Sequence, residues 1–342
     1  MALLEVDDLD VRFYTEEGVV QAVDGLSYTL DRGERLGVVG ESGAGKTVAA
    51  LALLDLLDAP GRIEGGSIRF DGEEVLDASP DRLRRLRGGE IGLVFQDPET
   101  ALDPVYTVGE QVAEAVRVHT DLAGDAAHDR AVSLLDRVGI PDPATRATQY
   151  PHEFSGGMAQ RAVVAVALAG DPDLLVADEP TTALDVTIQA QLLDLFDDLA
   201  ADDLAVQLIS HDLGVVAEFC DRVLVMYAGQ AVERTTVDDL FYRPKHPYTA
   251  GLLSAVPRIG DDRNRLQTIP GTTPDLASPP PGCRFHPRCP YAEDACTKRD
   301  PPLAAVDGES DAHRAACLAY VDDADFDGDL DFYVEVDGEV DP

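Results

Sequence analysis

Short apolar runs alternate with longer amphipathic stretches along the first 240 residues. Runs of four to six residues, apolar at nearly every position, end at Val39, Ala177, Ile209 and Tyr227. Such runs are typical of strands that are buried on both faces of a parallel sheet. Apolar positions recur at helical spacing over residues 108–120 and 126–138. The pattern predicts an α/β fold in which helices cover both faces of a mostly parallel sheet.

Other stretches divide the chain further. Apolar patterns predict early strands at residues 3–6, 9–13, 20–23 and 26–30. Helices are predicted at 48–57 and 162–169, the second holding the longest apolar run, which is too short to cross a bilayer. Beyond about residue 240 proline, glycine and arginine increase, so 269–282 is predicted to be irregular. Residues 321–342 are rich in aspartate and are expected to form a solvated, partly disordered tail.

Acidic residues dominate the composition. The net charge is −38 over 342 residues, and lysine occurs only at Lys46, Lys245 and Lys298. Molar salt would screen this repulsion, so we expect a high-salt cytoplasm of the kind found in halophilic archaea. Nucleic acid is not an expected partner, because binding it needs basic residues that replace the counterions of phosphates. The first residues lack the basic and apolar regions of a signal peptide, which predicts a cytoplasmic protein.

A glycine-rich loop follows the first buried strand and precedes a predicted helix. Its sequence is Gly40-Glu41-Ser42-Gly43-Ala44-Gly45-Lys46-Thr47. Backbone N–H groups in such a loop point at phosphates from a helix N-terminus, whose dipole favours anions. Lys46 is predicted to reach the β- and γ-phosphates of ATP, and the Thr47 hydroxyl to bind Mg²⁺.

Two neighbouring carboxylates end another apolar strand. Asp178 is placed to hold Mg²⁺ through water, and Glu179 to polarise an attacking water. Two such carboxylates could instead cap the following helix. The segment that follows, Pro180-Thr181-Thr182 and then Ala183-Leu184-Asp185, favours the catalytic interpretation.

The loop and the carboxylates belong to six segments that occur in a fixed order. The other segments contain Gln96, Ser155-Gly156-Gly157-Met158-Ala159-Gln160, Ala183-Leu184-Asp185 and His211. Together they resemble the nucleotide-binding subunit of an ABC (ATP-binding cassette) ATPase. The resemblance implies a RecA-like parallel core, an antiparallel β subdomain and an inserted helical subdomain at about 97–160. It divides the chain into an ATPase domain (1–240), a small cysteine-containing extension (241–320) and the tail (321–342).

The resemblance also assigns roles to individual residues. It implies that Phe13, or its neighbour Tyr14, stacks on adenine. It also implies that Gln96 senses the γ-phosphate through Mg²⁺, as a ligand of the ion, or through water, and that His211 contacts the γ-phosphate and orients the attacking water. Ser155, Gly156, Gly157, Gln160 and Asp185 would contribute to ATP sites, with Ser155 serving the site of a facing subunit. Two such chains would meet head to tail with ATP between them. Ala159 departs from the family, where arginine is usual.

Further segments narrow the resemblance to the oligopeptide/dipeptide importer ATPases, some relatives of which import nickel. These segments are 95–111, 150–154, His246-Pro247-Tyr248-Thr249-Ala250-Gly251-Leu252-Leu253 and Gly282-Cys283-Arg284-Phe285-His286-Pro287-Arg288-Cys289-Pro290. We therefore expect an ATPase that powers peptide import at the cytoplasmic face of the membrane. Its implied partners are two integral membrane permeases and, indirectly, an extracellular solute-binding protein. The alternatives are a nickel importer ATPase, a soluble ABC ATPase of DNA repair or translation, and a redox-responsive regulator.

Four of the five cysteines lie in the extension, at Cys283, Cys289, Cys296 and Cys317; the fifth, Cys220, is predicted to lie in a core helix. Disulfides are not expected in a reducing cytoplasm. The spacing fits neither zinc ribbons nor the common ferredoxin runs. Some ATPases of the family that this chain resembles carry a [4Fe–4S] cluster on these cysteines, so the resemblance implies a cluster. Zinc is the alternative, and ordinary thiols remain the third interpretation.

Overall fold

The computed structural model describes residues 2–182, 184–255, 269–306, 313–322, 324–326 and 330. Ala183 and most of the predicted acidic tail lie outside the described residues. No helix within the described ranges is long and apolar enough to span a membrane.

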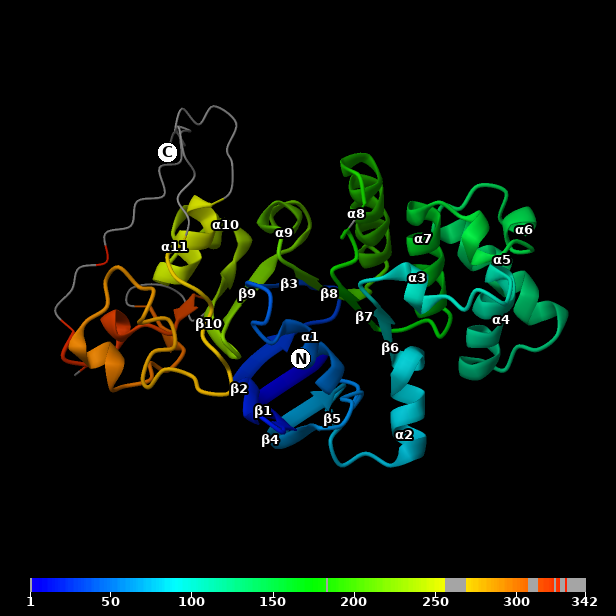
Figure 1. The fold of residues 1–342 in the computed structure, drawn as a ribbon. Coiled ribbons are helices and arrows are strands. Elements are labelled where there is room, and N and C mark those ends of the chain that lie inside the picture. The colour runs from blue at the N-terminus through cyan, green and yellow to red at the C-terminus, as the bar shows by residue number, and fades with distance from the viewer. Residues whose placement is uncertain are drawn as a thin grey trace.

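An eight-stranded sheet forms the centre of the molecule (Figure 1). Five of its strands are parallel, and the remaining three, which come last in the sequence, pair antiparallel. In spatial order the strands are β11 (Ala304–Ala305), β12 (Arg314–Ala315), β10 (Gln230–Thr236), β9 (Arg222–Tyr227), β3 (Arg35–Val39), β8 (Ala205–Ser210), β7 (Leu174–Asp178) and β6 (Ile91–Val94). The expectation of a mostly parallel sheet is confirmed, with an added antiparallel edge.

A separate antiparallel sheet packs on one face of this centre. Its strand order is β2 (Gly18–Leu30), β1 (Leu4–Thr15), β4 (Gly61–Phe70) and β5 (Glu73–Glu74). The segments predicted as strands 3–6 and 9–13 form one strand, because Asp8 takes a positive φ of 51° and the register with β2 shifts there without breaking the strand. The predicted strands 20–23 and 26–30 likewise merge into β2.

The helices are α1 (Lys46–Ala52), α2 (Pro80–Arg85), α3 (Pro98–Ala101), α4 (Val108–His119), α5 (Asp125–Arg137), α6 (Pro143–Arg146), α7 (Gly156–Ala167), α8 (Val186–Ala200), α9 (Leu213–Phe219), α10 (Val237–Tyr242) and α11 (Pro247–Ser254). The predicted helices at 108–120 and 126–138 are α4 and α5. The helix predicted at 48–57 is shorter, and the one predicted at 162–169 begins at Gly156. Cys220 is the residue after α9 and is buried. Helices α3 to α7 gather beyond the β6 edge of the central sheet (Figure 1).

Alternate residues of the central strands enter two different apolar cores. Leu175 and Ala177 of β7 pack with α7, α8 and α9, whereas Leu174 and Val176 pack with α1 and the antiparallel sheet. This alternation follows from the period of two of a strand. Because both faces are covered, the carboxyl ends of the parallel strands are the edge where polar groups can gather.

The extension is joined to the central sheet by backbone pairing. Glu233 and Arg234 of β10 pair with Ala315 and Arg314 of β12. The proline-rich segment has no helix or strand, as expected, and its Leu276 carbonyl accepts a hydrogen bond of 2.9 Å from the N–H of Gln21 in β2. The extension therefore packs on both sheets of the ATPase domain.

Candidate nucleotide-binding site

The glycine-rich loop leaves β3 and enters α1 through two positions that admit only glycine. Gly40 has φ +155°, and a Cβ there would lie 2.2 Å from the carbonyl oxygen of Met226. Gly45 has φ +98°, and its Cβ would lie 2.2 Å from the carbonyl oxygen of Ala22. Side chains at either position would clash with backbone that cannot move away. We call residues 40–47 the phosphate-binding loop.

Lys46 lies folded over this loop. Its Nζ donates to the carbonyl oxygens of Gly40 at 2.8 Å and Glu41 at 3.1 Å. Burial lowers the pKa of the Lys46 ammonium group below its usual value. The charges of Glu179 and Asp178 oppose this shift without cancelling it. Within the loop, Ser42 and Gly43 are exposed.

Asp178 ends β7 beside the loop and is buried, with 7% of its surface exposed. Burial raises the pKa of its carboxyl group, and a hydrogen bond from Thr47 opposes that shift. Its Oδ1 is buried without a hydrogen-bond partner among the described residues. A carboxylate oxygen and a hydroxyl beside each other are the kinds of ligand that Mg²⁺ takes, so these residues fit the ion.

The Glu179 carboxylate, which follows β7, contacts residues that follow the two neighbouring strands. Its Oε2 accepts hydrogen bonds from Nε2 of Gln96 at 3.0 Å and from the Thr182 hydroxyl at 3.1 Å, and Oε1 lies 3.2 Å from Nδ1 of His211. Gln96, Glu179 and His211 follow β6, β7 and β8, which are neighbours in the sheet. The structure therefore brings together all three residues predicted to be catalytic. Glu179 itself takes a positive φ of 47°, and its N–H donates to the Ile209 carbonyl.

The aromatic residue predicted to stack on adenine lies in the antiparallel sheet. Phe13 of β1 is half-buried and packs against Gly61, where a Cβ would come within 2.8 Å of its ring. Tyr14 is exposed, and its hydroxyl donates to Glu64.

The segment 155–160 opens helix α7. Ser155 is the N-cap, its hydroxyl accepts from the N–H of Met158, and both Ser155 and Gly156 are exposed. A Cβ on Gly157 would lie 2.6 Å from the Ile188 side chain, so glycine lets this turn pack on α8. Gln160 is buried, and its Nε2 has no partner among the described residues. Gln160, predicted to contribute to an ATP site, is therefore not part of the exposed surface of this segment.

Asp185 has a local role that the sequence did not predict. Its carboxylate accepts from the N–H groups of Thr187 and Ile188 and so caps helix α8. It is exposed, as is the following Val186. Ala183, which belongs to the same predicted segment, lies outside the described residues.

Two residues of the extension contact the phosphate-binding loop, which sequence reasoning missed. The Tyr248 hydroxyl accepts from the N–H of Glu41 at 2.8 Å, and the Arg288 guanidinium binds both carboxylate oxygens of Glu41. The segments that contain Tyr248 and Arg288 stand out in the sequence, but no pattern in them indicates a contact with Glu41.

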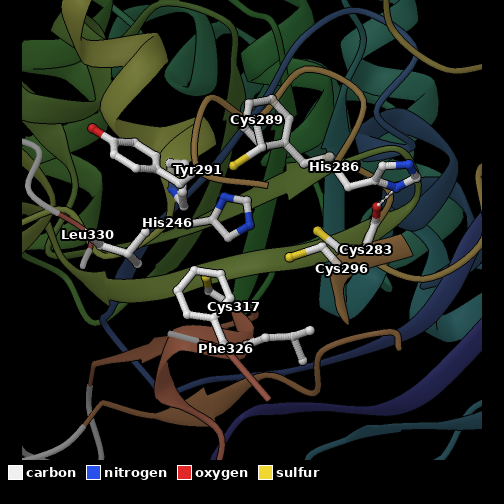
Figure 2. Close-up of a pocket in the computed structure, with 12 residues that line it drawn as sticks. His246, Cys283, His286, Cys289, Tyr291, Cys296, Cys317, Phe326 and Leu330 are labelled. Atoms are coloured by element: carbon white, nitrogen blue, oxygen red, sulfur yellow. Dashed lines mark hydrogen bonds between the residues drawn. The ribbon is translucent and has the colours of Figure 1, made fainter. Parts of the chain in front are cut away.

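The four cysteines of the extension line one pocket, together with His246, His286 and Phe326 (Figure 2). Burial raises the pKa of the Cys283 thiol to about 12 and of the Cys289 and Cys317 thiols to about 11. All five cysteines are free thiols. Within the described part of the chain, no three His, Cys, Asp or Glu side chains are arranged to hold a single metal ion.

Comparisons with known proteins agree with this geometry. The family model of the ABC transporter ATP-binding domain matches residues 23–182, and that of the oligopeptide/dipeptide transporter C-terminal region matches 232–296. The dipeptide transport ATP-binding protein DppD of Escherichia coli is 46% identical over 95% of this chain and 98% of its own. The oligopeptide transport ATP-binding protein OppD of Bacillus subtilis is 50% identical over 91% of this chain and 87% of its own.

The fold has solved counterparts. The ATP-binding cassette MJ0796, solved as a dimer bound to ADP and Pi, superposes with a TM-score of 0.62 at 25% identity. That match covers 68% of this chain and 98% of the cassette. The chain therefore belongs to the ABC transporter ATP-binding proteins, within the group that carries the oligopeptide/dipeptide transporter C-terminal region.

Proposed function

We propose that this ABC ATPase powers the import of di- or oligopeptides. The observation that carries the proposal is the extension, which matches the oligopeptide/dipeptide C-terminal region and is built into the central sheet through β12. Relatives that align over nearly their whole length are named for dipeptide and oligopeptide transport. The chain would act at the cytoplasmic face of the membrane, bound to two permease subunits that receive peptide from an extracellular solute-binding protein.

In the proposed mechanism Glu179 acts as the general base. Its carboxylate is held by Gln96 and Thr182 through one oxygen, which leaves Oε1 to polarise water with His211 beside it. Lys46 would leave the carbonyls of Gly40 and Glu41 to bind the β- and γ-phosphates. Thr47 and Asp178 would hold Mg²⁺, which neutralises charge on the phosphates.

A second ATPase subunit would complete each site. Ser155 and Gly156 are exposed at the N-terminus of α7, where backbone N–H groups and the helix dipole favour a phosphate. Exposed Asp185 and Val186 lie where a facing subunit could contact them. Head-to-tail pairing, with itself or with a paralogue, would bring Ser155 of one chain to the ATP held by the loop of the other.

The test is reconstitution. Co-expressed with the permease subunits of a peptide importer from the same genome, the chain should co-purify with them in detergent. Its ATPase activity in proteoliposomes should rise with peptide-loaded solute-binding protein. Stimulation by nickel and not by peptide would favour the nickel importer. Recovery with ribosomes or DNA and without integral membrane proteins would contradict the transporter function.

We also propose that the cysteine pocket holds a [4Fe–4S] cluster. Its support is that four thiols of the extension, buried at Cys296 and Cys317 and partly buried at Cys283 and Cys289, line one pocket. A zinc site needs all four sulfurs about 2.3 Å from one ion, whereas in a cluster each cysteine binds a different iron. The thiols must lose their protons to bind, and a cluster would favour that despite the raised pKa values.

The acidic surface supports function in concentrated salt. With a net charge of −38, like charges repel across the folded chain, and salt that shortens the Debye length weakens this repulsion. Raising KCl from about 0.2 M to about 2 M should therefore raise the melting temperature. A melting temperature that falls over this range would contradict adaptation to high salt.

A further inference from the structure

Arg288 forms a buried, two-point ion pair with the phosphate-binding loop. Its Nη1 and Nη2 donate to the two carboxylate oxygens of Glu41 at 2.7 and 3.0 Å. The Arg288 side chain is 6% exposed and that of Glu41 27% exposed. Nε of Arg288 donates to the carbonyl oxygen of Pro270, and the guanidinium lies over the Tyr227 ring. These contacts fix the fork of Arg288 in one orientation.

Every polar group of Glu41 has a partner. Its N–H donates to the Tyr248 hydroxyl, its carboxylate binds Arg288, and its carbonyl oxygen accepts from Nζ of Lys46 and from the N–H of Ala44. Two of these partners come from the extension, and Lys46 is the residue that must reach the phosphates. Glu41 is thus the point at which the extension contacts the nucleotide-binding machinery.

We propose that Arg288 is a positioning residue for the phosphate-binding loop, through which the extension sets the affinity of the chain for nucleotide. The inference rests on the proposed binding of nucleotide by residues 40–47 and adds a role for a residue outside that loop. Arg288 acts in two ways. It holds the first turn of the loop in place, and it neutralises a carboxylate beside the position of a highly charged polyphosphate.

The neutralisation of the Glu41 charge by Arg288 predicts a specific result for nucleotide binding. Without Arg288, the partly buried Glu41 carboxylate would be unpaired and would repel the phosphates of ATP through a medium of low dielectric. Removing the Glu41 charge as well should then restore binding. A merely structural role for Arg288 predicts no such recovery.

The neighbouring Arg284 supplies a matched control. Its guanidinium is also buried, and it binds Asp24, Gln21 and the Ala228 carbonyl oxygen. Arg284 therefore holds the extension on the ATPase domain through partners that lie outside residues 40–47. Loss of Arg284 tests whether loosened docking of the extension is enough to weaken nucleotide binding.

The experiment titrates a fluorescent ATP analogue with Mg²⁺ into the full-length chain and measures KM and kcat for ATP. Arg288→Gln should raise the Kd and KM about tenfold, within the range of coupling between contacting residues, and leave kcat within about twofold. Glu41→Gln alone is the reference for the double variant. Glu41→Gln with Arg288→Gln should bind more tightly than Arg288→Gln and within about threefold of Glu41→Gln alone. Arg284→Gln should lower the melting temperature and leave Kd unchanged.

Three outcomes would overturn the proposal. They are parental affinity in a folded Arg288→Gln variant, an equal loss of affinity in Arg284→Gln, and no recovery in the double variant. If Arg288→Gln does not fold, Arg288→Lys and Tyr248→Phe replace it, since the first keeps the charge and the second removes only the hydroxyl that binds Glu41. Parental Kd and KM in both would contradict the proposal. A parent chain that binds no nucleotide would instead contradict the ATPase assignment, before any variant is compared.

Discussion

Gln96 and Glu179 meet through a hydrogen bond of 3.0 Å between Nε2 of the amide and Oε2 of the carboxylate, across 83 positions of sequence. Gln96 follows β6 and leads into the region of helices α3 to α7, whereas Glu179 follows β7 in the central sheet. Any shift of those helices that moves Gln96 therefore changes the hydrogen bonds of the carboxylate. The contact connects the position of the helical region to the carboxylate that we propose acts on water.

Glu179→Gln should leave ATP binding intact and lower hydrolysis at least about a hundredfold, because the amide cannot accept a proton from water. The variant should accumulate as an ATP-bound dimer. Phosphate release at saturating ATP measures the first effect, and size-exclusion chromatography with ATP measures the second. Hydrolysis at the parental rate would show that another group is the base.

Lys46→Ala should weaken nucleotide binding itself, in contrast to Glu179→Gln. Its ammonium group is the cation that must replace its present bonds to Gly40 and Glu41 with bonds to phosphate. Titration with a fluorescent ATP analogue checks this. Comparable affinity in the parent and in Lys46→Ala would place the phosphates elsewhere.

The cysteine pocket predicts a visible property. Protein purified without oxygen should be brown with about four irons per chain, because a [4Fe–4S] cluster contains four irons and is held by four cysteine thiolates. Serine at Cys283, Cys289, Cys296 or Cys317 should remove the colour. Cys220→Ser should not, since Cys220 is buried beside Gly37 of the ATPase core. Colourless anaerobic protein with one zinc, or with no metal, would contradict the cluster.

Asp221 should stabilise the fold in a pH-dependent way. Burial raises the pKa of its carboxyl group, but hydrogen bonds from the side chain and N–H of Arg35 outweigh this, and the net pKa is lowered from 3.8. The stabilisation is therefore present above about pH 4 and is lost as the pH falls through the lowered value. Asp221→Asn should cost about 1 kcal/mol at pH 7, a figure reduced for partial exposure, and less near pH 3.

Asp197→Asn is the matched control, because Asp197 accepts a single hydrogen bond from the same guanidinium. It should cost less than Asp221→Asn at neutral pH. Urea unfolding at both pH values compares the variants. A cost for Asp221→Asn that is the same at pH 3 and pH 7 would contradict the ionic origin of the effect.

Much of the nucleotide site could be predicted because its residues lie in short motifs at the ends of apolar strands. Asp178 is the last residue of β7, His211 follows β8, and the loop that contains Lys46 follows β3. Parallel strands place their carboxyl ends at one edge of the sheet. Local pattern therefore implied spatial proximity. The same reasoning predicted α4 and α5 within one or two residues, because their apolar faces are regular.

Contacts between distant segments could not be predicted in this way. The pair of Arg288 and Glu41 spans 247 positions, and it depends on how the extension folds back on the ATPase domain. Likewise, the polar residues around Asp8 predict a break between two strands. The positive φ that Asp8 adopts lets one strand continue through this position. The buried position of Gln160 depends on how α7 packs, which the sequence motif does not specify.

The pairing of β12 with β10 has a consequence for dividing the protein into parts. A chain ending near residue 240 would keep β10 but lose β11 and β12, so a row of backbone N–H and C=O groups would be left exposed along the sheet. Unpaired strand edges of this kind recruit other chains and promote aggregation. The pairing of β12 with β10 thus covers an edge of the central sheet that would be open in the shortened chain.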